Sequence, residues 1–281
     1  MGVFVGGVYA LVGLGLSLIF TGIRNTINIC HGQLFILGSY LAFTFARNLG
    51  LDPLLSLVFV LPIVFCLGYA LQFGLLNKVV FKGLDPYIMV TMGIGLVFEN
   101  AILLVYKPDM RSLAPFASYA AASLEVAGVR ISLAYLIDFI AALLIMLLVY
   151  FFMKRTYMGR AIRATSEDSV CAQLFGVNDR KIYATTYAIG SLLAAVGGVF
   201  AGLIYAFEPS SGWVYLDMAF AVIVLGGVGS IRGALLGGII LGVVQALASY
   251  YIGIVYAYLT SCLITLIILA IRPQGLLGYK V

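Results

Sequence analysis

The sequence predicts an all-α polytopic membrane protein, and three observations lead to that fold class. Of its 281 residues, 63% are hydrophobic and only 10% are charged. The mean hydropathy of +1.14 agrees with this composition and excludes a soluble globular domain. The apolar residues also form runs long enough to cross about 30 Å of hydrocarbon as helices. No soluble linker divides these runs, so we expect a single transmembrane domain over residues 1–281.

Nine apolar runs are candidate membrane-spanning helices. In chain order they are Gly2–Phe20, Ile29–Ala46, Leu54–Leu76, Tyr87–Tyr106, Ile131–Met153, Ile182–Phe207, Leu216–Ser230, Gly233–Tyr251 and Gly253–Ile271. The run Leu216–Ser230 is short for a complete crossing, and an alternative with eight crossings makes it re-entrant. Only Met1 precedes the first run, which we therefore expect to be an anchor that is not cleaved.

The basic residues indicate how these spans are oriented. With nine spans and the loop Lys154–Lys181 inside, the N-terminus lies outside, the C-terminus lies inside and Lys107–Arg130 is the longest outside loop. Twelve of the 16 basic residues then fall inside, namely Arg24, Lys78, Lys82, Lys154, Arg155, Arg160, Arg163, Arg180, Lys181, Arg232, Arg272 and Lys280. This excess agrees with the positive-inside rule. The net charge of +5 therefore reflects orientation rather than binding of nucleic acid, for which no basic stripe with interleaved aromatic residues is present.

The loop Lys154–Lys181 is a charged interruption that contains its own helical pattern. Thr165 is followed three positions later by Asp168, a variant of the capping box, and Gly176 can end the helix. Its apolar face consists of Val170, Cys171, Leu174 and Phe175. So short a helix is marginal in isolation, so we expect a soluble partner to cover it. A solvated connector without a special role is the alternative interpretation.

Two acidic residues lie near the middle of predicted spans, Glu99 with its neighbour Asn100 and, in the next span, Asp138. Ionisable groups are costly within hydrocarbon and usually face protein or a water-filled cavity. The three side chains could line a substrate path. The alternative is a structural role, in which they satisfy hydrogen bonds or in which the two carboxyl groups pair with one of them protonated.

A polar cluster precedes and opens the second span. It consists of Asn25, Asn28, His31 and Gln33, and it suggests partly unwound backbone that lines a cavity. A structural hydrogen-bonding role for His31 is the alternative. His31 is the only histidine, and no Cys or carboxylate stands beside it at ligand spacing, so we expect no metal site.

Motifs for catalysis are missing from the sequence. There is no Walker A loop, no GxSxG and no HExxH. We therefore expect neither enzymatic activity nor a bound cofactor.

Glycines recur every fourth residue within the predicted spans. The series are Gly198 with Gly202, Gly229 with Gly233 and Gly237, and Gly238 with Gly242. This spacing of small residues lets helix backbones approach closely in lipid, so it predicts tightly crossing helices.

Several segments, spread in order over nearly the whole chain, resemble the H-type permease of branched-chain amino acid ABC importers, in the hydrophobic and polar amide uptake group. They are Tyr9-Ala10-Leu11, Asn28-Ile29-Cys30-His31-Gly32-Gln33, Thr91-Met92-Gly93, Met158-Gly159-Arg160-Ala161-Ile162-Arg163-Ala164, Leu225-Gly226-Gly227-Val228-Gly229-Ser230-Ile231-Arg232-Gly233-Ala234 and Arg272-Pro273-Gln274-Gly275-Leu276. Two residues depart from the family pattern, Gln33 where Glu is usual and Glu99 where Gln is common.

The resemblance implies the ABC importer permease fold in the bacterial inner membrane, with membrane lipid around it. It implies a related second permease as a heterodimeric partner, two cytoplasmic ATPase subunits and an external substrate-binding protein. The helix Thr165–Gly176 then resembles the coupling helix that docks on an ATPase, with Gly159, Arg160 and Arg163 beside it. The implied function is translocation of branched-chain amino acids or related small amides by ATP-driven alternating access.

Three other functions remain open at this point. The first is import of urea, short amides or other small organic solutes by the same machinery. A proton-coupled secondary transporter would use Glu99 and Asp138 as its relay and would tolerate loss of ATP. A channel-like pore for a small neutral solute would conduct downhill without nucleotide. Loss of uptake on deletion of a companion ATPase would exclude the last two.

Overall fold

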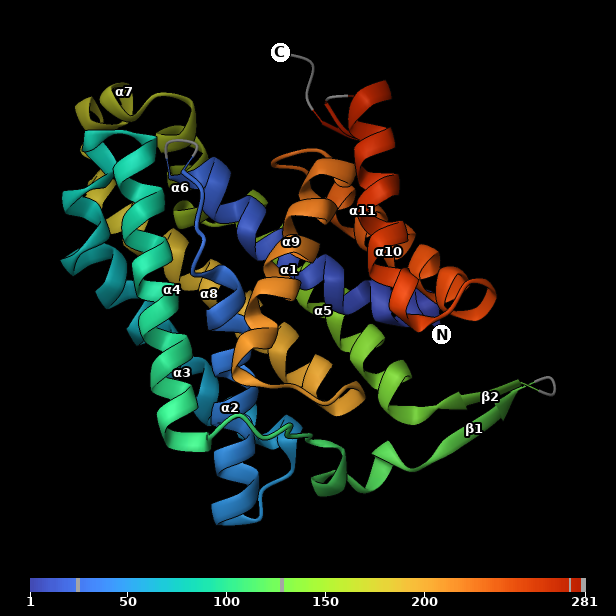
Figure 1. Cartoon of the computed structure of the whole chain (residues 1–281). Helices are drawn as coiled ribbons and strands as arrows, with labels where there is room; N and C mark the ends of the chain where they lie inside the picture. Colours follow the sequence, from blue (N-terminus) through green and yellow to red (C-terminus); the bar gives the residue numbers. More distant parts are fainter. Residues whose placement is uncertain (24–25, 127–128, 273, 279–281) are drawn as a thin grey trace.

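The computed structural model of the protein describes residues 1–23, 26–126, 129–272 and 274–278 (Figure 1). The long helices are α1 (Gly2–Gly22), α2 (His31–Leu49), α3 (Pro53–Gly74), α4 (Leu84–Tyr106), α5 (Leu133–Arg155), α8 (Asp179–Ile204), α9 (Gly212–Gly226), α10 (Ile231–Tyr251) and α11 (Ile254–Ile271). The shorter elements that the argument uses are α6 (Tyr157–Glu167), α7 (Ser169–Leu174), β1 (Ser123–Val126) and β2 (Val129–Ser132). The predicted all-α membrane fold is confirmed, with the small antiparallel hairpin β1–β2 as an addition.

Eight helices in the described residues are long and apolar enough to cross a membrane, as judged from length and composition. The predicted span Ile29–Ala46 is not among them. It forms α2, whose polar residues Gln33 and Arg47 make it less apolar than its neighbours. The predicted span Leu216–Ser230, for which a re-entrant segment was the alternative, begins earlier, with a 3-10 turn at Pro209, and ends at Gly226. The element Pro209–Gly226 is long enough to cross.

The two ends of the helical bundle carry different loops (Figure 1). At one end, Gly22 at the end of α1 lies against Ile162 of α6. At the other end, Phe43 near the end of α2 packs edge-on against Phe116 in the loop after α4, with 5.6 Å between ring centroids. The helix α2 therefore ends at the end of the bundle that carries the loop after α4, and it begins beside Val12 in the middle of α1. Arg24 and Lys280 of the charge count lie outside the described residues.

Two largely buried helices, α1 and α8, form the centre of the bundle. Glycines allow close crossings there. A Cβ on Gly198 of α8 would lie 1.9 Å from the carbonyl oxygen of Phe35, and a Cβ on Gly238 of α10 would lie 2.5 Å from the carbonyl oxygen of Gly6. The predicted small-residue packing is thus confirmed for these helices. Gly229 differs, because its φ of +79° places it in the α9–α10 loop rather than within a helix.

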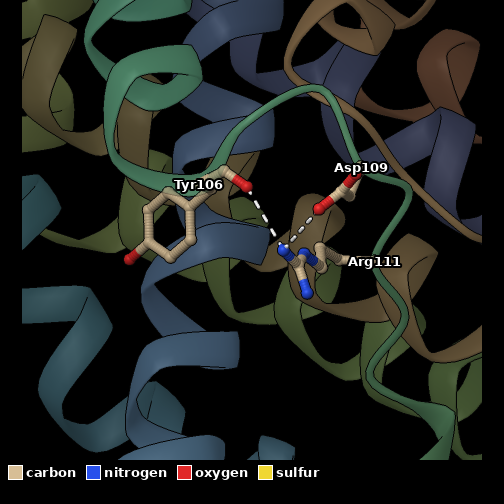
Figure 2. Close-up of polar contacts among 3 residues, drawn as sticks. All are labelled: Tyr106, Asp109 and Arg111. Atoms are coloured by element: carbon tan, nitrogen blue, oxygen red, sulfur yellow. Dashed lines mark hydrogen bonds and ion pairs between the residues drawn. The ribbon is translucent and has the colours of Figure 1, made fainter.

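The loop after α4 is fastened to the ends of three helices. Arg111 donates from Nη2 to the carbonyl oxygen of Tyr106 at 3.2 Å and pairs with Asp109 at 3.1 Å (Figure 2). Its backbone exchanges two hydrogen bonds with Phe207, just after α8. Its guanidinium also lies 5.7 Å from the ring centroid of Phe43. The loop is therefore held over the ends of α2, α4 and α8.

Candidate translocation and docking sites

The charged loop folds differently from its sequence pattern. Thr165 does not cap a helix; it lies near the end of α6 and donates its hydroxyl to the carbonyl oxygens of Ala161 and Ile162. The helix α6 ends at Glu167, and the backbone of the next residue, Asp168, is extended. The carboxylate of Asp168 caps α7 by accepting from Val170 N at 2.9 Å and from Cys171 N at 3.0 Å. The predicted single helix Thr165–Gly176 is therefore wrong, because a short polar side chain within a helix can return its hydrogen bond to the preceding turn.

The second helix of the loop, α7, presents the predicted apolar face to the outside. Val170 is 67% exposed, while Leu174 and Phe175 are each 83% exposed. Cys171 is exposed as well. Gly176 follows with a φ of +79°, a conformation that suits glycine and lets the chain turn away. The helix has only six residues, and so short a helix is marginally stable without a contact that covers its apolar face.

The preceding helix, α6, is joined closely to α5. A Cβ on Gly159 would lie 2.5 Å from Met153 Cα, so only glycine permits this approach. Arg160 and Arg163 are exposed on the same helix. A displacement of α6 and α7 would therefore be passed to the end of α5.

Three members of the predicted polar cluster lie inside the protein. Asn28 and His31 are 0% exposed and Gln33 is 1% exposed, and Asn25 lies outside the described residues. Asn28 Oδ1 accepts from the hydroxyl of Tyr187 at 3.2 Å, and His31 Nε2 lies 3.0 Å from the carbonyl oxygen of Val12. The predicted break in the backbone is present at residues 26–28, but the side chains are enclosed by the helix core instead of lining an open cavity.

A second polar group joins α4, α9 and α2. The indole Nε1 of Trp213 donates to Glu99 Oε2 at 2.8 Å. Trp213 and Gln33 both approach Gly95, one turn before Glu99. Asn100 is exposed on α4 and donates its amide to the carbonyl oxygen of Leu96. Sequence reasoning missed Trp213, although it is the only tryptophan in the chain.

Asp138 stands apart from that group. It lies in the second turn of α5 rather than in the middle of a span, and it is 0% exposed. Its electrostatic neighbours are Tyr119 and Tyr135. Within the described part of the chain neither of its oxygens has a hydrogen-bond partner, so the alternative in which Glu99 pairs with Asp138 is absent there.

Two hollows lie along α1, toward its opposite ends. The first, of about 600 Å³, is called the cationic hollow, and Lys154, Arg163 and Arg232 contribute to its lining. The second, of about 750 Å³, is called the tyrosine hollow, and it is lined in part by Tyr9, Tyr135, Tyr205, Tyr215, Tyr250 and Tyr258. Of the predicted path and docking residues, only Arg163 lines either hollow. The residues that line the two hollows come from distant parts of the sequence, so no sequence motif predicts them.

A family model described as the permease component of branched-chain amino acid transport systems matches residues 1–271. The chain belongs to this permease family. It is 33% identical to the high-affinity branched-chain amino acid transport system permease protein BraD of Pseudomonas aeruginosa, over 99% of this chain and 94% of the relative. It is 31% identical to the corresponding protein LivH of Escherichia coli, over 99% of this chain and 93% of the relative.

A third relative is LivM, another high-affinity branched-chain amino acid permease protein of Escherichia coli. It is 24% identical over 96% of this chain and 68% of the relative. No solved structure matches the chain. The resemblance seen in the sequence is confirmed, and the protein is an ABC transporter permease integral to the inner membrane rather than an enzyme.

Proposed function

We propose that the protein is one of two permease subunits of an importer that carries branched-chain amino acids across the inner membrane by ATP-driven alternating access. Two cytoplasmic ATPases would dock on its charged loop, and an external binding protein would deliver the substrate. The names of BraD and LivH support the substrate class. The observation that carries the mechanism is the exposed apolar face of α7.

The surroundings of α7 favour a soluble protein as the partner for this face. Leu174 and Phe175 lie within a loop that contains six basic residues, so this segment does not suit the interior of a membrane. A protein groove would cover the apolar side chains, while nearby cations such as Arg160 meet acidic groups at its rim. Because α6 packs on α5 through Gly159, ATP-driven movement of the docked helix would shift α5 within the bundle.

The orientation follows from the same loop. We place residues 154–181 in the cytoplasm, because the basic residues concentrate there and the positive-inside rule then holds. The loop 107–132 lies at the opposite end of the bundle and is external in this arrangement, with the N-terminus outside and the C-terminus inside.

The exposed face of α4 is the proposed place of the substrate path. Glu99 is only partly buried and Asn100 is exposed, although both lie within a membrane-spanning helix. Polar groups facing lipid cost free energy, so this face is expected to meet protein or water. Large apolar side chains such as Leu104, which is 85% exposed, surround them. A second permease covering α4 would enclose a path with Glu99 and Asn100 on its wall, and the pair LivH and LivM in one organism supports a heterodimer.

The test replaces Leu174 by aspartate. A charge buried without a partner in a docked contact costs several kcal/mol, and about 3 kcal/mol already weakens binding more than 100-fold. Leu174→Asp should therefore insert and fold, but it should no longer copurify with the ATPases or stimulate their hydrolysis of ATP.

Ala164→Asp is the matched control. It makes the same change in net charge at an exposed position of the neighbouring helix α6, outside the apolar face of α7. The control should retain the ATPases at the wild-type level. Wild-type copurification and wild-type transport-coupled hydrolysis by Leu174→Asp would contradict docking on α7 and return the loop to a solvated connector.

A further inference from the structure

The cationic hollow lies apart from the proposed translocation path. It lies where the end of α1 meets α6, between the end of α5 and the start of α10. The path candidates Glu99 and Asn100 do not line it. Its volume of about 600 Å³ is large enough for a small polar headgroup with part of its chains.

Positive charge predominates at the rim of the hollow. Lys154, Arg163 and Arg232 line it together with a single carboxylate, that of Glu167. None of the three cations forms an ion pair with a carboxylate of the described residues. Lys154 Nζ donates to the hydroxyl of Tyr150 at 3.3 Å, and Arg232 lies close to the same hydroxyl. Two cations from different helices thus converge on one point with their charge uncompensated.

The start of α10 adds donors at the same place. Ser230 caps this 21-residue helix by accepting from Gly233 N at 3.0 Å. The backbone N–H groups of Ile231 and Arg232 have no acceptor among the described residues. Both residues line the hollow. Unpaired N–H groups and the positive end of a helix dipole favour an anion with several oxygens.

The deeper wall of the hollow is apolar. It is made by Leu14, Leu18, Val149, Met153 and Ile162, from α1, α5 and α6. On α5, Leu147 and Ile140 precede Lys154 by seven and fourteen residues and so lie on its face of the helix; they are 51% and 47% exposed and continue this surface along the membrane-spanning segment. An anion bound here would therefore stand at the end of an apolar track that runs toward the hydrocarbon.

We propose that the cationic hollow binds the phosphate of an anionic phospholipid, whose acyl chains lie along the exposed side chains of Leu147 and Ile140 of α5. Cations and amide donors at the rim match the phosphate, and the apolar wall matches the chains. A soluble anion would leave the apolar wall unused, and a docked protein would not continue onto the hydrocarbon-facing side of α5. The proposed orientation of the chain adds only that the lipid belongs to the cytoplasmic leaflet.

Bound lipid would bridge helices that meet at the hollow. Arg163 belongs to α6, Lys154 lies in the last turn of α5, and Arg232 lies in the first turn of α10. A shared phosphate would hold α6 in a fixed position relative to α5 and α10. The lipid should therefore stabilise the permease against heat as well as bind it.

The experiment measures lipid binding to the full-length chain by native mass spectrometry, with phosphatidylglycerol and phosphatidylcholine titrated separately. Each cation near an anionic headgroup contributes about fivefold to affinity, so the double variant Lys154→Gln/Arg232→Gln should bind phosphatidylglycerol about 25-fold more weakly. Arg180→Gln/Lys181→Gln is the matched control, because it removes the same charge from exposed residues of the same loop outside the hollow. The control should bind as the wild-type chain does.

Three outcomes would overturn the proposal. One is equal affinity of the wild-type chain for the two lipids, and another is an equal loss in the two double variants, which would indicate unspecific attraction to surface charge. Protection against heat by inorganic phosphate as strong as that by the lipid would indicate a soluble anion instead. If Lys154→Gln/Arg232→Gln does not fold, the site is tested instead by crosslinking a photoactivatable phosphatidylglycerol to the wild-type chain and mapping the labelled residues. It should label residues 144–154 and 228–232, and labelling elsewhere alone would refute the site.

Discussion

Replacement of Gly198 by alanine tests the packing at the centre of the bundle. The new Cβ would lie 1.9 Å from the carbonyl oxygen of Phe35, whereas Cβ contacts under 3.0 Å are essentially never observed. The α2 and α8 backbones would therefore have to separate by about 1 Å. Ser39 Oγ donates to the carbonyl oxygen of Gly198 at 2.8 Å, and this buried hydrogen bond would be lost in the separation. Gly198→Ala should therefore disrupt both the close crossing of α2 with α8 and the hydrogen bond that joins them.

The expected cost combines two effects. Overpacking a well-packed core costs about 1–3 kcal/mol. Leaving the buried hydroxyl of Ser39 without its acceptor adds about 1–3 kcal/mol. The better helix propensity of alanine returns up to about 1 kcal/mol. A net loss of about 3 kcal/mol in the free energy of unfolding should lower the melting temperature of the purified permease by roughly 5 °C.

Gly93→Ala is the matched control for this measurement. Gly93 also lies within a long helix, α4, but a Cβ there would meet nothing within 4 Å. Its melting temperature in detergent, followed by the monodisperse fraction after heating, should stay within about 2 °C of the wild type. A melting temperature of Gly198→Ala equally close to the wild type would refute the inference that α2 and α8 cross in rigid contact.

Two other predictions concern transport and orientation. Glu99→Gln keeps the side-chain shape but weakens the hydrogen bond from the indole of Trp213, so uptake should fall about fivefold while the chain accumulates normally; unchanged uptake across pH would assign Glu99 a structural role. In a background without the four native cysteines, an impermeant thiol reagent applied to intact cells should label Ser118→Cys and leave Ser166→Cys unmodified. Both positions are exposed, so labelling of Ser166→Cys alone would reverse the proposed topology.

The membrane class and the approximate positions of most spans followed from the sequence. Long apolar runs have few stable solutions in lipid, because every backbone group must be paired within the segment, and this requires a helix. Glycine spacing likewise anticipated close crossings such as that of Gly198 with Phe35. These features depend on neighbours in the chain or on a regular repeat, which a sequence displays directly.

Other features were decided only by contacts between distant segments. Thr165 is of a residue type that often caps helices, yet α6 continues through it and ends just before Asp168. His31 looks like a cavity residue, yet α1 packs over it. Burial of a polar side chain depends on which helix faces it, and local composition does not specify that.

The partner of Glu99 and the cationic hollow are the clearest cases of tertiary control. Trp213 reaches Glu99 across 114 positions of sequence, and Lys154 and Arg232 meet from helices at separate places in the chain. Apolar runs and clustered charges were enough to predict that this chain spans a membrane and carries a charged loop between its helices. Which polar groups meet depends on the packed fold, because the helices pack by the shape of their faces and not by their order in the chain.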